Sequence, residues 1–369
     1  MTNQRTYRVI ISGGGTGGHI YPAIAIANVL LEKSHVKILF VGALGKMEMQ
    51  KVPEAGYEII GLWISGLQRK ITLDNLFFPL KVISSVLKSF KILRDFRPDL
   101  VVGVGGYASG PLMFAATRKN IPALIQEQNS YAGLTNKWLA NRVQKICVAY
   151  KGMEKFFPAE KIVLTGNPVR KDILNVDYKK SEAVTHFSLK RDKKTVLIIG
   201  GSLGARSINE AVVSNLPEIT AYGFQVIWQT GKFYNVEMIE RTKEYDLSSV
   251  RIVEFLREMD LAYAASSIVI SRAGALSISE LGIAKRPVIF IPSPNVAEDH
   301  QTKNAVALVN EKAALMIPDK EVTRRLAQEV IKLAENDNLM ETLAKNIGKL
   351  GKPDASDHIT DEILKLMAA

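Results

Sequence analysis

The sequence predicts an α/β protein with two doubly wound, Rossmann-like domains. Its 369 residues are 47% apolar, which is enough to form two separate hydrophobic cores. Short β-branched runs alternate with glycine turns and amphipathic helical stretches in both halves, as in proteins with parallel sheets. Both halves also begin with an apolar strand, a glycine-rich turn and a helix, at Ile10–His19 and Ile198–Arg206. We therefore expect two related parallel-sheet domains separated by a cleft.

The strands expected in the first domain are Tyr7–Ser12, Val36–Val41, Leu100–Val104, Ala123–Gln126 and Val143–Val148. Those expected in the second domain are Thr195–Ile199, Phe224–Trp228, Val250–Val253, Ile268–Ile270 and Val288–Ile291. The domains are predicted at residues 1–166 and 167–350, because a proline in Gly166–Arg170 interrupts regular structure. Residues 351–369 form a further helical pattern, and the sequence does not reveal where this helix docks.

Composition narrows the class of protein. The formal net charge of +11 implies an anionic partner, namely nucleic acid, an acidic membrane or phosphorylated substrates. The basic residues form no recognisable nucleic-acid motif, so nucleic acid is not expected. Cys147 is the sole cysteine, which excludes an internal disulfide and a thiolate metal cluster. No apolar run suits a membrane span, and the first is too short for a signal peptide, so a cytoplasmic protein is expected.

Glycine-rich turns between strands and helices suggest phosphate binding. They lie at Gly13–Gly18, Gly103–Tyr107, Gly200–Gly204 and Arg272–Ala275. Such turns bring the N–H groups of a helix N-terminus close to a phosphate, although tight helix–strand packing also explains any single one. A P-loop would need a Lys-Ser/Thr pair, which is missing after Gly18. A dinucleotide site would need an acid where the second strand ends, and Phe40–Ala43 contains none. The sequence therefore favours neither a P-loop nor a dinucleotide-binding site.

Glu280 offers another ligand for a ribose. It follows Ala275 and Leu276 at the start of an expected helix in the second half. A carboxylate at this position can reach two ribose hydroxyls while the helix N-terminus faces the phosphates. An ordinary acid stabilised by the helix dipole would look the same in sequence. The spacing alone does not decide between these readings.

An ordered set of motifs points to one enzyme family. The motifs are Gly14–Pro22, Gly105–Pro111, Glu127–Asn129, Gly166–Arg170, Gly200–Arg206 and Ser271–Leu276, and the set ends near Gln301. This set resembles the MurG family of N-acetylglucosaminyltransferases over about residues 8–305. The resemblance implies the GT-B fold and UDP-GlcNAc as the donor. It also implies transfer to the C4 hydroxyl of the muramyl residue of undecaprenyl-pyrophosphoryl-muramyl-pentapeptide (lipid I), which forms lipid II in peptidoglycan synthesis.

The resemblance also implies roles for individual residues. Glu280 would bind the donor ribose, the backbone at Leu256 the uracil, and Ser202 a phosphate. The other donor contacts it implies are Thr16, Gly17, Gly18, Asn129, Arg170, Ala275, Leu276, His300 and Gln301. The acceptor contacts would be Gly14, Gly15, Thr16 and Tyr107. The sequence departs from the family at Leu203, at Gln126 and at His300, and the last of these leaves the sugar contact divided between His300 and Gln301.

His19 is the candidate general base, because histidine titrates near neutral pH and this one lies where the first glycine turn meets its helix. It would deprotonate the acceptor hydroxyl; capping the helix or contacting the acceptor pyrophosphate are the alternatives. Helix N-termini and Arg170 or Arg272 would stabilise the leaving UDP. Since the chain has no Asp-x-Asp motif, we expect metal-independent, inverting transfer that gives a β1→4 linkage.

Residues 61–97 combine many apolar side chains with an excess of basic ones. This composition suits the surface of an anionic bilayer, where a polyprenyl substrate resides. The membrane contacts expected are Leu73, Leu76, Phe77, Phe78 and Lys81. Most of Val82–Phe90 is expected to be core, and the alternative reading makes the whole apolar stripe core. The predicted location is the cytoplasmic face of the bacterial inner membrane, with peripheral attachment.

Two other enzyme classes remain possible on the sequence alone. A different GT-B enzyme that glycosylates another lipid would share the fold and the donor. A UDP-GlcNAc epimerase would share the two-domain architecture and would consume UDP-GlcNAc without an acceptor.

Overall fold

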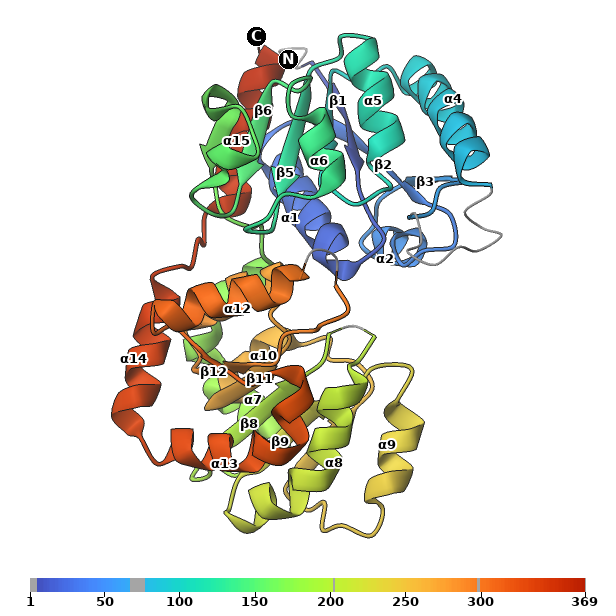
Figure 1. Cartoon of the computed structure of the whole chain (residues 1–369). Coiled ribbons are helices and arrows are strands. Elements are labelled where there is room, and N and C mark those ends of the chain that lie inside the picture. The colour runs from blue at the N-terminus through green and yellow to red at the C-terminus, as the bar shows by residue number, and fades with distance from the viewer. Residues whose placement is uncertain (1–4, 67–76, 202, 297–298, 369) are drawn as a thin grey trace. The chain divides into compact units, whose positions relative to one another are not determined.

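The structure, a computed structural model, describes residues 5–66, 77–201, 203–296 and 299–368. The chain forms two compact α/β units (Figure 1). One unit contains the residues up to Arg170 together with those from Pro353 onward, and the other spans Lys171–Lys352. The division lies after Arg170 and not after residue 166. The reason is that Asn167 is buried in the first unit, where it hydrogen-bonds the Gln126 side chain and the Gln128 carbonyl.

The first unit contains a seven-stranded parallel sheet in the order β3-β2-β1-β4-β5-β6-β7. Its strands are β1 (Tyr7–Ser12), β2 (Val36–Ala43), β3 (Ile59–Leu62), β4 (Leu100–Gly103), β5 (Ala123–Glu127), β6 (Lys145–Val148) and β7 (Ile162–Leu164). Ile10 of β1 is paired with Leu39 of β2 on one side and with Val101 of β4 on the other. The strand order reverses between β1 and β4, and ligands of doubly wound sheets bind at the carboxyl ends of the strands at such a point.

The second unit contains a six-stranded parallel sheet in the order β10-β9-β8-β11-β12-β13. Its strands are β8 (Thr195–Ile199), β9 (Gln225–Gln229), β10 (Val250–Val253), β11 (Ile268–Ser271), β12 (Val288–Phe290) and β13 (Leu315–Met316). Ile198 of β8 is paired with Trp228 of β9 and with Ile270 of β11. The order reverses between β8 and β11, as it does between β1 and β4 in the first unit.

Helices cover both faces of each sheet (Figure 1). Those of the first unit are α1 (Gly17–Lys33), α2 (Glu48–Glu54), α4 (Phe78–Phe96), α5 (Gly110–Arg118), α6 (Leu134–Leu139) and α15 (Ala355–Ala368). Those of the second unit are α7 (Lys180–His186), α8 (Arg206–Ala221), α9 (Asn235–Thr242), α10 (Met259–Ala265), α11 (Ala275–Ala284), α12 (His300–Asn310), α13 (Val322–Ala334) and α14 (Asp337–Gly348). Short 3-10 helices lie at Met153–Lys155, Ala159–Lys161, Lys171–Lys179 and Asp319–Glu321.

Every strand predicted from the sequence is present, with its ends shifted by at most two residues. Strands β3, β7 and β13 were not predicted from the sequence, and each of these lies at an edge of its sheet. Their residues are largely only partly buried. At four, three and two residues, their apolar runs are also too short to be assigned to a strand by pattern alone.

The core of each unit consists of two apolar layers, one on either face of the sheet. In β1, Ile10 belongs to one layer and Ile11 to the other, as the alternation of side chains along a strand requires. The final helix, α15, packs beside α1 in the first unit, where Ile359 and Ile363 are fully buried. Lys33 of α1 forms ion pairs with α15, to Asp357 at 3.0 Å and to Asp361 at 2.9 Å. Among the described residues, no helix has the length and apolarity that a membrane span requires.

Candidate functional site

His19 lies in the first turn of α1, at the carboxyl end of β1. Its Nδ1 is 3.1 Å from the hydroxyl oxygen of Thr16, the N-cap residue of the same helix. Its ring lies against the turn that follows β4, because a Cβ atom at Gly105 would be 3.0 Å from His19 Cδ2. Gly105 has a φ of +91°, so glycine is required there by backbone conformation as well as by space. The structure thus brings His19 together with the first two glycine turns.

A residue that the sequence analysis missed, Glu48, holds the first glycine turn in place. Its buried carboxylate accepts the Gly15 N–H at 3.0 and 3.2 Å and the Ala43 N–H at 2.9 Å. A Cβ atom at Gly14, where φ is +154°, would lie 2.1 Å from Glu48 Oε1, so a side chain there would displace the carboxylate. Glu48 lies just beyond β2, close to where a dinucleotide enzyme has its ribose-binding acid, but here the acid binds protein backbone.

The ring of Tyr107 also contacts the first glycine turn. A Cβ atom at Gly15 would lie 3.2 Å from Tyr107 Cε1, so the ring is in contact with the turn. Burial, and secondarily the Glu48 carboxylate, raise the pKa of the Tyr107 hydroxyl. The phenol therefore stays protonated at neutral pH and can donate a hydrogen bond. The expected acceptor residues Gly14, Gly15, Thr16 and Tyr107 are thus gathered with His19 in one place.

A buried carboxylate also orients Asn129, at the carboxyl end of β5. Glu127 accepts the backbone N–H of Asn129 at 3.0 Å and its side-chain amide at 3.3 Å. The same carboxylate accepts the Gly133 N–H at 3.0 Å and the Asn136 amide at 2.9 Å. The position of Asn129 is therefore determined by Glu127, since both of its nitrogens are anchored there.

Glu280, the expected ribose ligand, is buried in α11, which begins with Ala275 and Leu276. The hydroxyl of the fully buried Tyr263 donates a hydrogen bond of 3.0 Å to its Oε2. Nothing in the spacing of the sequence indicated this contact, because Tyr263 comes from α10. The tyrosine fixes the orientation of the carboxylate within the unit.

Two further expected donor contacts, Leu256 and Gln301, are hydrogen-bonded within the second unit. The Leu256 N–H donates to the Gln229 side chain at 3.0 Å, and Gln301 accepts the Ser293 N–H at 2.9 Å. His300 is the first residue of α12, directly before Gln301. Ser202 lies outside the described residues.

The Arg272 guanidinium forms its contacts within its own unit. Its guanidinium forms an ion pair with Asp319 and donates to the Ser207 hydroxyl and to the Ile291 carbonyl, each at 2.9 Å. An arginine paired with a carboxylate adds little net charge toward a leaving diphosphate. The guanidinium of Arg170, the other expected phosphate ligand, lies in the first unit at 5.9 Å from the ring centroid of Tyr21.

Two models of the glycosyltransferase family 28 match the chain: the N-terminal domain at residues 9–148 and the C-terminal domain at residues 195–359. A curated relative from Cytophaga hutchinsonii is 55% identical over 100% of this chain and 99% of its own length. Another, from Flavobacterium psychrophilum, is 53% identical over 98% of each chain. Both carry the name UDP-N-acetylglucosamine--N-acetylmuramyl-(pentapeptide) pyrophosphoryl-undecaprenol N-acetylglucosamine transferase. The chain belongs to glycosyltransferase family 28.

Solved structures agree with this family 28 assignment. MurG from Acinetobacter baumannii is 27% identical, with a TM-score of 0.76 over 97% of this chain and 99% of that one. A UDP-GlcNAc 2-epimerase from Neisseria meningitidis, solved with UDP-GlcNAc bound, has a TM-score of 0.67 at 17% identity, over 98% of this chain and 100% of that one. At this identity, the likeness to the epimerase shows only that the two proteins share a fold. The expected GT-B fold, with two Rossmann-like domains, is confirmed.

The expected membrane contacts of this family 28 chain are only partly found on its surface. Leu73 and Leu76 lie outside the described residues, whereas Phe77 is exposed and Phe78 half-buried. The expectation for Lys81 was wrong, because this lysine is buried and donates to the Ser65 hydroxyl at 3.2 Å.

The expectation that most of Val82–Phe90 is core was also wrong in part. Ile83 and Leu87 are 57% and 64% exposed, while the polar Ser85 and Ser89 face inward. The two buried serines satisfy their hydroxyls by donating to the carbonyls of Trp63 and Ser85. Helix α4 therefore presents part of its apolar side to solvent.

Proposed function

We propose that this chain transfers GlcNAc from UDP-GlcNAc to the C4 hydroxyl of the muramyl residue of lipid I, which forms lipid II. The observation that carries the proposal is the 55% identity, over the full length of both chains, with a relative named for this transfer. The arrangement of His19 beside the first two glycine turns supports it, because a base and a set of backbone N–H groups meet there.

In this reaction the acceptor oxygen attacks the anomeric carbon of the donor, and the bond to UDP breaks. If His19 donates its Nδ1 proton to Thr16, which lies 3.1 Å away, then Nε2 carries the lone pair that accepts the hydroxyl proton. The electron pair of the broken bond leaves with the diphosphate. Helix N-termini in the second unit and Arg170 or Arg272 would stabilise that charge. Attack from the face opposite UDP turns an α-linked donor into a β1→4 product.

The donor contacts are proposed residue by residue. Glu280, held by Tyr263, would bind the ribose hydroxyls, and the backbone near Leu256 would contact the uracil. Gln301 or His300 would bind hydroxyls of the GlcNAc. Ala275 and Leu276 would contribute the N-terminal N–H groups of α11.

A transfer assay tests the proposed function. The full-length chain is incubated with labelled UDP-GlcNAc and a short-chain analogue of lipid I in the presence of EDTA. We expect the label to enter the lipid, and we expect no transfer from UDP-galactose. Labelling of a different lipid would overturn the acceptor, and consumption of UDP-GlcNAc without an acceptor would identify an epimerase. Loss of activity in EDTA would overturn metal independence.

We also propose that α4 attaches the protein to the cytoplasmic face of the inner membrane. Ile83 and Leu87 share an exposed side of the helix, and Leu80 lies one turn before them on the same side. The exposed cations Lys91 and Arg94 follow on the next turns. Apolar side chains that can insert, with cations that can pair with acidic headgroups, suit an anionic bilayer.

Replacing Ile83 and Leu87 together with serine should weaken binding to vesicles of acidic phospholipid by at least about tenfold, because two large apolar side chains no longer insert. Sedimentation with the vesicles measures the bound fraction. The matched control replaces Val236 and Ile239, which are 83% and 47% exposed on α9, and should bind as the wild type does. Equal loss of binding in both double variants would count against α4 as the contact.

A further inference from the structure

Gln229, the last residue of β9, connects two loops that belong to different strands. Its side chain is 4% exposed, with its amide nitrogen donating to the Gly201 carbonyl at 2.9 Å. Its amide oxygen accepts the Leu256 N–H at 3.0 Å. Because β9 lies between β8 and β10 in the sheet, a side chain at its end can reach the loops that follow both neighbours.

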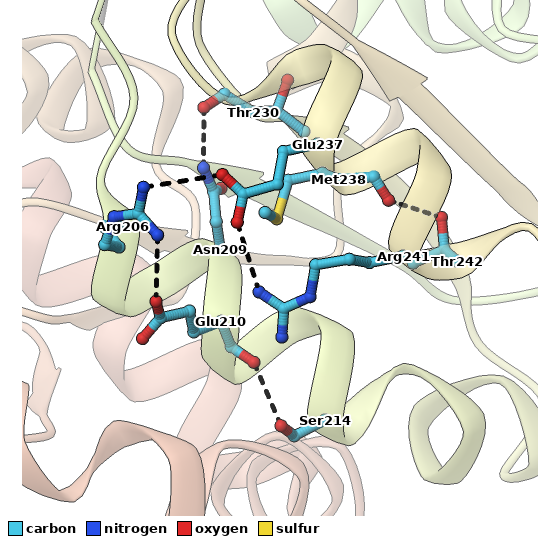
Figure 2. Close-up of polar contacts among 9 residues, drawn as sticks. All are labelled: Arg206, Asn209, Glu210, Ser214, Thr230, Glu237, Met238, Arg241 and Thr242. Carbon is cyan, nitrogen blue, oxygen red and sulfur yellow. Dashed lines mark hydrogen bonds and ion pairs between the residues drawn. The ribbon is translucent and has the colours of Figure 1, made fainter.

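The backbone next to Gln229 is tightly fitted to the same two loops. A Cβ atom at Gly204, where φ is +83°, would lie 2.1 Å from the Thr230 carbonyl oxygen. The same carbonyl accepts the Asn209 amide at 2.8 Å, a contact drawn in Figure 2. The Gly231 N–H donates to the Glu254 carbonyl at 3.0 Å. The loops after β8, β9 and β10 are thus joined by direct contacts, with Gln229 at the centre.

Ion pairs connect α8 and α9, the helices that follow β8 and β9. Arg206, at the start of α8, pairs with Glu210 at 3.4 Å and with Glu237 of α9 at 3.5 Å (Figure 2). Arg241 pairs with the same Glu237 at 3.6 Å. These exposed pairs are individually weak. They nevertheless link the helices that follow β8 and β9, whereas Gln229 and Gly231 bond the loop after β10.

We infer that Gln229 is a positioning residue for the donor nucleotide, setting the distance between the proposed phosphate-binding backbone at Gly201 and the proposed uracil-binding backbone at Leu256. The inference rests on the proposed function, which places UDP across these two loops. A ligand that binds both loops benefits when their spacing is set in advance, since the cost of ordering them is not taken from its binding free energy. A ligand that binds only one loop gains much less.

The test compares Gln229→Met with Gln225→Met, and titration calorimetry measures the dissociation constants of UDP and of uridine. Gln225 is a closely matched control: it lies at the opposite end of β9, is 3% exposed, and bridges other segments by bonding the Lys190 N–H and carbonyl. We expect Gln229→Met to weaken the binding of UDP about tenfold, because two hydrogen bonds between the loops are lost. The binding of uridine should weaken less than about threefold. Gln225→Met should lower the melting temperature without changing either constant.

Gln229→Glu provides a second variant if the methionine variant does not fold. The new carboxylate can still accept a hydrogen bond from the Leu256 N–H, but it has no donor for the Gly201 carbonyl. The binding of UDP should therefore again weaken more than that of uridine. Wild-type affinity for UDP in a folded Gln229 variant, or an equal loss for UDP and uridine, overturns the inference. If the wild-type chain itself binds no UDP, the donor assignment fails and the inference fails with it.

Discussion

Replacing His19 with alanine should lower the turnover number by about 10²–10⁴-fold, the usual contribution of a general base. The affinity for UDP should stay near the wild-type value, because the proposed contacts with the uracil and the ribose lie in the second unit. The imidazole is placed for this task by Thr16 on one side and by the Gly105 turn on the other. Pre-steady-state transfer from labelled UDP-GlcNAc to a lipid I analogue measures the chemical step directly.

Two controls separate base catalysis by His19 from positioning. The His19→Gln variant can still hydrogen-bond an acceptor but cannot take up a proton at neutral pH, so it should be about as slow as the alanine variant. Added imidazole should restore part of the activity of His19→Ala. If the glutamine variant turns over at nearly the wild-type rate, His19 only positions the acceptor and the base lies elsewhere.

Replacing Glu48 with alanine should impair both folding stability and acceptor use. Its carboxylate accepts three hydrogen bonds from the Gly15 and Ala43 backbones, and hydrogen bonds to a charged group contribute about 1.5–3 kcal/mol each. Because the two contacts with Gly15 share one N–H, we expect a loss of about 3–5 kcal/mol in the free energy of unfolding. Urea denaturation measures this loss.

The same variant should raise the acceptor KM and lower kcat/KM by about 100-fold, because a displaced catalytic turn costs this much. The affinity for UDP should be unaffected. Glu54→Ala is the control, since Glu54 lies on the same helix and forms an exposed pair with Lys51, so its stability should change by about 0.5 kcal/mol or less. Normal acceptor kinetics in a folded Glu48→Ala protein would show that the carboxylate is only structural.

The central strands could be predicted from the sequence because each is buried on both faces. Tyr7–Ser12 and Thr195–Ile199 are found with the predicted bounds, and both have neighbouring strands on either side. The edge strand Ile59–Leu62 was missed, because an apolar run of four residues cannot be assigned to a strand by its pattern alone. The docking of α15 on α1 was also out of reach, since it depends on Lys33 meeting acids more than 300 residues away in the chain.

In the candidate site, the sequence by itself determined the glycine turns and the position of His19. These features are local: a turn and the helix after it are encoded by adjacent residues. Only the tertiary structure decided that Glu48 supports the Gly15 turn and that Tyr263 orients Glu280. It also decided that Gln229 joins two loops.

Which side chains of α4 are buried was likewise decided only by the tertiary structure. The sequence placed Lys81 on the membrane side and most of Val82–Phe90 in the core. The structure instead buries Lys81, where it bonds Ser65, and exposes Ile83 and Leu87. Which side of a helix faces its sheet depends on contacts with segments distant in the chain, and the periodicity of one helix does not contain that information. The residues that build the site were therefore visible in sequence, whereas the buried side chains that hold them became visible only in the fold.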